Sequence, residues 1–140
     1  MKALFAAVCA VALTAACSSP RQGVPPMRLW TQDLAVRITS DPAPPRAREP
    51  NIYRVEVRDR TSGQPIEGGE GRVYATSRDG ASAWDGLTPG PQPGTYYAKL
   101  NFVTAGDWAM GLQFRRDSAQ KIETMDDWRT QVSGASGEAR

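Results

Sequence analysis

Apolar and polar residues alternate along four segments of the chain. The apolar members are Leu34, Val36 and Ile38; Tyr53, Val55 and Val57; Tyr96, Ala98, Leu100 and Phe102; and Trp108, Met110, Leu112 and Phe114. Successive side chains of a strand point to opposite faces, so each segment predicts a strand with one apolar face and one more solvent-exposed face. This two-sided character is typical of antiparallel sheets with one solvated side.

Residues rich in proline and glycine separate these segments, and they lie at 41–45, 61–65, 68–69 and 89–94. Proline lacks the N–H that a strand ladder needs, and glycine permits tight turns. A fifth strand is expected near 71–77, and weaker ones at 81–87 and near Ile66. The short segment 105–107 is expected to join the last two strong strands as a hairpin. About seven strands over residues 27–117 predict an all-β, immunoglobulin-like antiparallel β-sandwich.

The segment 118–140 follows another pattern. Its apolar residues Ile122, Met125, Trp128 and Val132 recur at spacings of three, three and four, which predicts a short C-terminal helix. Ser118 is a suitable N-cap for it. We expect this helix to dock on the sandwich rather than to bind a partner, and residues 133–140 to form a frayed end.

The first 16 residues have the features of a signal peptide. Lys2 precedes an uncharged apolar run over residues 3–16, which is too short to span a bilayer. The stretch Leu13-Thr14-Ala15-Ala16-Cys17 resembles the lipobox of bacterial lipoproteins. That resemblance implies cleavage before Cys17, acylation of Cys17 and, with Ser18 following it, the outer membrane rather than the inner one. The alternative is an ordinary secretory signal that leaves Cys17 as a free thiol.

The segment after Cys17 is polar and rich in proline and glycine, so residues 17–26 are expected to form a flexible tether. The other cysteine, Cys9, lies in the signal peptide and would be removed. The processed chain would then contain neither histidine nor an unmodified thiol. Catalysis by Ser/His/Asp or Cys/His groups, thiolate metal sites and disulfides are therefore not expected.

Carboxylate pairs remain as candidates for chemistry, namely Asp126 with Asp127 and Glu67 with Glu70. Nothing in the sequence marks either pair as buried, so we expect no enzyme and no cofactor. The chain has 17 Lys and Arg against 15 Asp and Glu, a net charge of +2. This small and mixed balance does not indicate a nucleic-acid partner.

The segment 77–86 contains two Asp-Gly pairs and a tryptophan that is expected to be exposed. We predict a binding loop for an envelope protein or glycan here, with Arg78, Asp79, Trp84 and Asp85 as its candidate residues. Two alternatives stay open. Asp79 and Asp85 could contribute to a Ca²⁺ site, although their spacing matches no EF-hand, or the segment could be a plain turn.

Arginine dominates the basic residues, with 14 arginines against three lysines. Arg54 and Arg58 are expected on the solvent face of one strand, where they could bind the anionic groups of lipopolysaccharide or the carboxylates of peptidoglycan. Interleaved acidic residues such as Glu56 and Asp59 favour instead a solvated face of mixed charge.

Two stretches, 53–69 and 93–112, together resemble a known family. A strand ends at Asp59 and leads into Gly63-Gln64-Pro65-Ile66-Glu67-Gly68; later Gly94-Thr95-Tyr96 precedes Ala105-Gly106-Asp107-Trp108. This arrangement resembles the YtkA-like and FixH-like domains of bacterial envelope proteins. The resemblance implies a small periplasmic β-sandwich, and some members are associated with copper delivery or cation transport.

A copper site of that kind is not expected in this chain. Without histidine or a free thiol, only Met27, Met110 and Met125 could supply soft ligands, and Met110 falls in register with core residues. We therefore predict a lipid-anchored periplasmic module that binds or scaffolds other envelope components. The alternative is an accessory protein of the FixH/YtkA type that handles copper or another cation.

Overall fold

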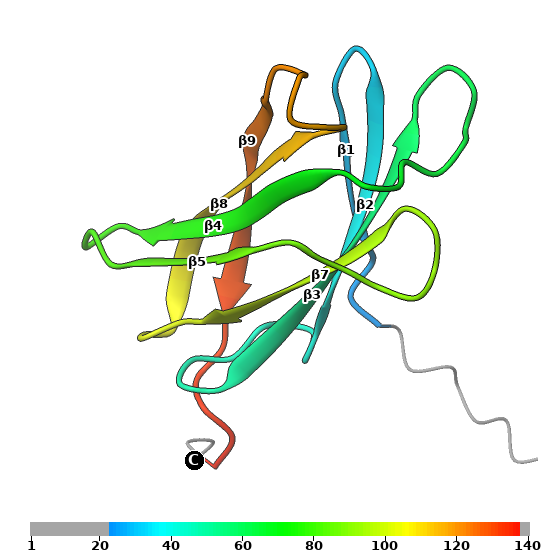
Figure 1. Ribbon diagram of the computed structural model, residues 1–140. Helices are drawn as coiled ribbons and strands as arrows, with labels where there is room; N and C mark the ends of the chain where they lie inside the picture. The colour runs from blue at the N-terminus through cyan, green and yellow to red at the C-terminus, as the bar shows by residue number, and fades with distance from the viewer. Residues whose placement is uncertain (1–22, 138–140) are drawn as a thin grey trace, which may run out of the picture.

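The computed structural model describes residues 23–137, which form nine strands in two antiparallel sheets (Figure 1). The five-stranded sheet has the order β1-β2-β3-β7-β6 and the four-stranded sheet the order β5-β4-β8-β9. The strands are β1 (Met27–Trp30), β2 (Leu34–Asp41), β3 (Pro50–Asp59), β4 (Glu70–Ser77), β5 (Ser82–Gly86), β6 (Thr88–Pro89), β7 (Thr95–Asn101), β8 (Gly106–Arg115) and β9 (Glu123–Val132). The predicted all-β antiparallel sandwich is confirmed, with nine strands in place of about seven.

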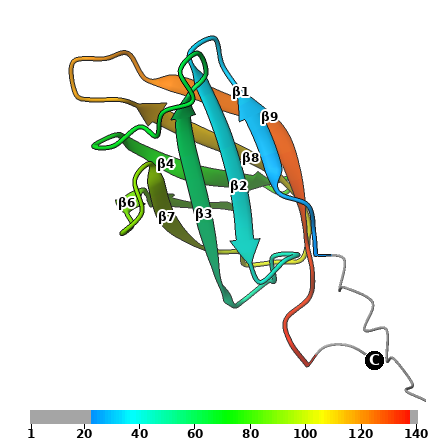
Figure 2. The same ribbon diagram turned by 90° about the vertical axis from the view of Figure 1, so that its right-hand side faces the viewer.

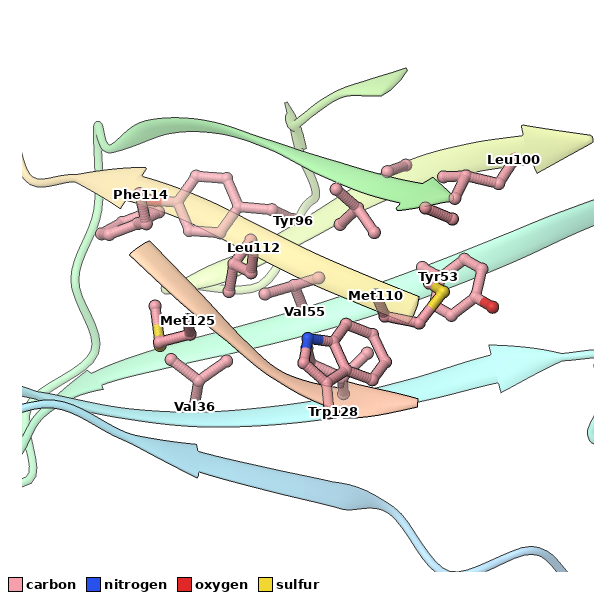
Figure 3. Packing of buried hydrophobic residues seen from close by; sticks show 14 of the residues in the cluster. Val36, Tyr53, Val55, Tyr96, Leu100, Met110, Leu112, Phe114, Met125 and Trp128 are labelled. Carbon is pink, nitrogen blue, oxygen red and sulfur yellow. The ribbon is translucent and has the colours of Figure 1, made fainter. Parts of the chain in front are cut away.

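The hydrophobic core lies between the two sheets and contains the apolar residues that the alternation singled out. The largest fully buried side chains are Trp108, Tyr96, Phe102 and Phe114. Their rings meet edge to face, with centroids 5.0 Å apart for Phe102 and Trp108 and 5.5 Å apart for Tyr96 and Phe114. Figure 3 shows side chains from both sheets filling this space. Such edge-to-face aromatic contacts stabilise the core beyond the area that they bury.

The predicted C-terminal helix is wrong, because residues 123–132 form β9. In the pairing with β8, Met125 lies opposite Leu112 and Trp128 opposite Met110, so two residues of β9 face the single residue Gly111. This β-bulge places Met125 and Trp128 on the same inward face although they are three residues apart. Ile122, the first member of the supposed helical stripe, precedes β9 and is exposed, and Ser118 lies in a turn and caps no helix.

The segment 105–107 does not close a hairpin, contrary to the prediction. β7 pairs with β3 and β6, whereas β8 pairs with β4 and β9, so the connection crosses from one sheet to the other. Phe102 is buried where β7 ends, and the Trp108 indole N–H donates to the Thr104 carbonyl at 3.1 Å. These contacts hold the connection where the chain passes from one sheet to the other. A loop of this length is long enough for such a crossing as well as for a hairpin.

Two buried polar side chains fix the loops that flank β3. The Asn51 side-chain oxygen accepts the Arg46 N–H at 2.7 Å, and its amide donates to the carbonyl oxygens of Arg46 and Glu49. The Tyr96 hydroxyl donates to the Ile66 carbonyl at 2.6 Å and accepts the Gly69 N–H at 3.0 Å. Because buried polar groups need partners, each side chain holds its loop in one conformation.

The predicted signal peptide, the acylated Cys17 and most of the tether lie outside the described residues. Within residues 23–137, no helix is long and apolar enough to cross a bilayer.

Candidate functional site

The four residues of the predicted binding loop fall on two different parts of a β-hairpin. Arg78 and Asp79 lie in the turn between β4 and β5, where Gly80 adopts a φ of 85° and its N–H donates to the Ser77 carbonyl at 3.1 Å. Trp84 and Asp85 lie on β5 itself. As neighbours on a strand they point to opposite sides of it, so the four residues do not converge on one point.

Asp85 is occupied by a contact with the other sheet. Its Oδ2 accepts the backbone N–H of Lys99 at 2.8 Å. β6 pairs with β7 only at Tyr97 and Tyr96, so Lys99 lies beyond the end of that pairing. The carboxylate therefore satisfies a strand-edge donor and links the edges of the two sheets. Among the described residues, no three histidine, cysteine or acidic side chains gather where they could hold a metal ion, which gives the calcium alternative no support.

Trp84 lies at the outer end of a row of residues that face one another across the strands of the four-stranded sheet. It lies opposite Tyr74 of β4, and Tyr74 lies opposite Gly111 of β8. A Cβ atom at Gly111 would come within 2.1 Å of the Tyr74 ring, so the absence of a side chain there lets the ring lie flat across β8. The bulge residues Asp126 and Asp127 continue the row on β9.

Charged groups surround the Tyr74 ring. The Arg72 guanidinium carbon lies 5.7 Å from the ring centroid, within cation–π distance. Partial burial raises the pKa of the Tyr74 hydroxyl, and the nearby Asp126 carboxylate raises it further. The hydroxyl therefore stays protonated near neutral pH and can donate a hydrogen bond. We call Arg72, Tyr74 and Trp84, with the sheet surface beside them, the aromatic face.

A shallow groove of about 480 Å³ lies on the aromatic face between Trp84 and Ile122. Both side chains are unusually exposed for apolar residues, Trp84 at 65% and Ile122 at 46%. The groove is also lined by Glu70, Gly71, Arg72, Gly86, Gln113, Phe114 and Arg115. At its rim, Arg115 and Glu70 form an ion pair at 2.7 Å. Trp84, Arg72 and Arg115 line this concave surface, and Tyr74 lies beside Trp84. Tryptophan, tyrosine and arginine are the residue types that contribute most to protein–protein binding.

Sequence reasoning found Trp84 but missed Tyr74 and Gly111. Two signals could have found them: a tyrosine at an outward position of a predicted strand, and a glycine in the interior of the strand 106–115. Neither signal shows that the two residues are neighbours, because that depends on the register of β4 against β8.

The outer face of the five-stranded sheet has a different composition. Its outward positions include Arg28, Arg37, Arg54, Arg58 and Lys99, with Trp30 exposed at the margin. The acidic residues on it are Glu56, which pairs with Arg37 and Arg54 at 3.5 Å each, and Asp41 at the end of β2. We call Arg28, Trp30, Arg37, Arg54 and Arg58 the arginine face.

The predicted mixture of charges on this face is only partly present. Asp59 points away from it, and its Oδ2 accepts a hydrogen bond from Arg116 at 2.6 Å. The Ser62 N–H and the Arg116 guanidinium hold the pKa of the Asp59 carboxyl well below its ordinary value. Asp59 lies on β3 and Arg116 follows β8, so the pair joins the two sheets on a side of the molecule away from both outer faces.

The chain is similar to known proteins in its fold. No family model and no curated protein matches the chain in sequence. A DUF4426 family protein from Pseudomonas aeruginosa superimposes with a TM-score of 0.60 at 11% identity, over 77% of this chain and 94% of that chain. A copper-bound variant of FetP from uropathogenic Escherichia coli superimposes with a TM-score of 0.52 at 9% identity, over 83% and 98%. The chain thus has the β-sandwich fold of these small proteins.

Proposed function

We propose that this protein is a lipid-anchored binding module of the bacterial envelope that performs no catalysis. The observation that carries the proposal is the exposed Trp84 beside Tyr74 and Arg72, at the edge of a groove on a rigid sheet. A large exposed apolar side chain beside a groove is typical of an interaction site. The residue types favour a protein as the partner of the aromatic face, with an envelope glycan as the alternative.

The proposed location rests on the sequence around Cys17. Cleavage before this residue and its acylation would anchor the chain on the periplasmic side of a membrane, the outer membrane rather than the inner one. Two or three acyl chains are needed for stable anchoring, because a single chain binds only marginally. Replacing Cys17 by serine should release the protein from the membrane fraction; unchanged retention would contradict the anchor.

The alternative function is copper or cation handling of the FixH/YtkA type. The superposition with copper-bound FetP favours it, but the soft ligands available here are poorly placed. Met110 and Met125 are buried in the core, and Met27 lies on β1 at the edge of the other sheet. Titration of residues 23–140 with Cu(I) tests this alternative, and saturable one-to-one binding below micromolar would establish it in place of the binding module.

The binding site is tested by crosslinking in living cells. A photo-crosslinking amino acid at Ile122, across the groove from Trp84, should give a discrete adduct. The same residue at Val103, which is also exposed but lies on the loop after β7, serves as the control. Trp84→Ala should abolish the adduct at 122 without lowering the amount of folded protein. Equal adducts at 122 and 103, or an adduct at 122 that survives Trp84→Ala, would contradict the proposal.

A further inference from the structure

The charges of the described domain are separated although they balance in number. Residues 23–137 contain 14 Lys and Arg and 14 Asp and Glu, so this part of the chain is formally neutral. The outward positions of the five-stranded sheet nevertheless hold five cations against the two carboxylates of Glu56 and Asp41. The surplus of positive charge on one sheet face must be balanced by negative charge elsewhere on the domain.

The arginines of this face are neighbours across strands. Arg28 of β1 lies opposite Arg37 of β2, and Arg37 lies opposite Glu56 of β3. In the next row Trp30 lies opposite Ala35, and Ala35 lies opposite Arg58. A shallow depression of about 190 Å³ lies among these side chains. The single negative charge of Glu56 cannot neutralise the arginines around it, because the same carboxylate contacts both Arg37 and Arg54.

Trp30 adds an apolar group to the same face. Its side chain is 59% exposed, although tryptophan is highly buried on average in folded proteins. Tryptophan is enriched where a protein meets the interface of a membrane, and arginine extends its charged end into the headgroup region. Its neighbour across the strands, Ala35, has a small side chain that does not cover the ring. Figure 2 views the molecule from the side of β1, β2 and β3, which present this face.

The position of the first strand brings this face close to the proposed anchor. β1 is the edge strand of the five-stranded sheet, and it begins at Met27, ten residues after Cys17. Ten residues span at most about 35 Å when fully extended. Five strands cover a width of roughly 20 Å, at about 4.8 Å between neighbours. A tether of this length lets the whole face lie flat on the bilayer that holds the acyl chains.

From these observations we infer that the arginine face docks on an anionic phospholipid surface, with Arg28, Arg37, Arg54 and Arg58 contacting headgroup phosphates and Trp30 entering the interface. This inference extends the proposed function, because it sets the orientation of the anchored domain. The aromatic face belongs to the four-stranded sheet, the other sheet of the sandwich (Figure 1). The groove beside Trp84 then points away from the membrane.

The test uses the domain without its anchor. All nine strands and the whole core lie between Met27 and Val132, so a fragment of residues 23–140 keeps the complete sandwich. Its binding to vesicles of phosphatidylcholine with about one-third phosphatidylglycerol is compared with binding to phosphatidylcholine alone, by sedimentation in low salt. We expect binding only to the anionic vesicles, and its loss in 0.5 M salt as screening shortens the reach of the charges (roughly threefold from 0.1 to 1 M).

Two triple variants with the same change of charge show which sheet face binds the vesicles. Arg28→Gln/Arg37→Gln/Arg58→Gln removes three cations of the arginine face, and Arg72→Gln/Arg115→Gln/Arg129→Gln removes three from the four-stranded sheet. Each basic residue near an anionic surface strengthens binding roughly fivefold, so the first variant should bind about a hundredfold more weakly. The second should bind nearly as well as the unchanged fragment. Circular dichroism and thermal unfolding check that both variants are folded.

Trp30 provides an independent readout. Quenching of tryptophan fluorescence by brominated lipid should be strong in the unchanged fragment and should largely disappear in Trp30→Phe. Equal loss of binding in the two triple variants, binding that ignores phosphatidylglycerol, or quenching that persists in Trp30→Phe would each overturn the inference. Because the fragment lacks Cys17 and the assay does not use the groove, a negative result here leaves the anchor and the Trp84 crosslink to be judged on their own tests.

Discussion

The two outer faces of this sandwich have different surface chemistry, although each lies on an antiparallel sheet that covers the same core. The aromatic face offers Trp84, Tyr74 and a groove, and its nearby charges Arg115 and Glu70 pair with each other. The arginine face has a smaller depression of about 190 Å³, and its arginines outnumber its carboxylates. The difference shows how one fold can carry two surfaces of different chemistry, because outward positions are free of the packing demands that fix the inward ones.

The largest expected effect tests whether both faces depend on one core. Trp128 is nearly buried on β9 and lies opposite Met110, so Trp128→Ala should lower the free energy of unfolding by about 3–5 kcal/mol. The matched control is Trp84→Ala, which removes an exposed tryptophan and should change it by less than about 0.5 kcal/mol. Urea unfolding measures both. Similar values for the two variants would contradict the placement of β9 in the sandwich.

Acid should remove the stabilisation that the Asp59 carboxylate provides at the end of β3. Because its hydrogen bonds to Ser62 and Arg116 lower the pKa of Asp59, this carboxyl stabilises the folded state above its ordinary pKa of about 3.9. That stabilisation is lost as the pH falls below this value and the carboxyl becomes protonated. The thermal midpoint should therefore fall on acidification from pH 5 to pH 2, and more gently in Asp59→Asn. Parallel pH profiles for the two proteins would show that the ionised Asp59 carboxylate does not stabilise the folded state.

The smallest effect sharpens the contrast between the faces. Glu56→Gln frees Arg37 and Arg54 from their shared carboxylate, and should strengthen binding to anionic vesicles roughly fivefold, since one opposing charge is removed. It should cost less than about 1 kcal/mol in stability, because these ion pairs are partly exposed. Glu70→Gln is the control, as it removes the partner of Arg115 on the aromatic face and should leave vesicle binding unchanged. Equal gains in both variants would mean that only net charge matters.

Period-two alternation was enough to predict the sandwich, because the inward residues of β2, β3, β7 and β8 repeat without interruption. It failed for β9, where the bulge opposite Gly111 puts two residues between Met125 and the next inward residue, Trp128, so that a spacing of three imitates a helix. The hairpin at 105–107 failed for another reason: loop length does not tell whether two strands share a sheet. Both errors concern which strands pair and in what register, and the pattern of a single segment does not encode either.

The candidate sites were predictable only in part, for the same physical reason. Trp84 stood out because a tryptophan between two Asp-Gly pairs is conspicuous in a sequence. Its neighbour Tyr74 and the arginine cluster depend on register, which brings Arg28, Arg37 and Arg58 together from three strands. In the sequence, Arg54 and Arg58 indicate an anionic partner, whereas the neighbouring Asp59 indicates a face of mixed charge. In the fold, Asp59 points away from that face and contacts Arg116.

The central claim is that the arginine face meets the membrane while the aromatic face points away from it. Acylated protein is reconstituted into vesicles that contain phosphatidylglycerol and a lipid-borne quencher, with a fluorophore attached at Trp30→Cys in one sample and at Trp84→Cys in another. The account predicts strong quenching at position 30 and little at position 84. Equal quenching at the two positions, or stronger quenching at 84, would contradict it.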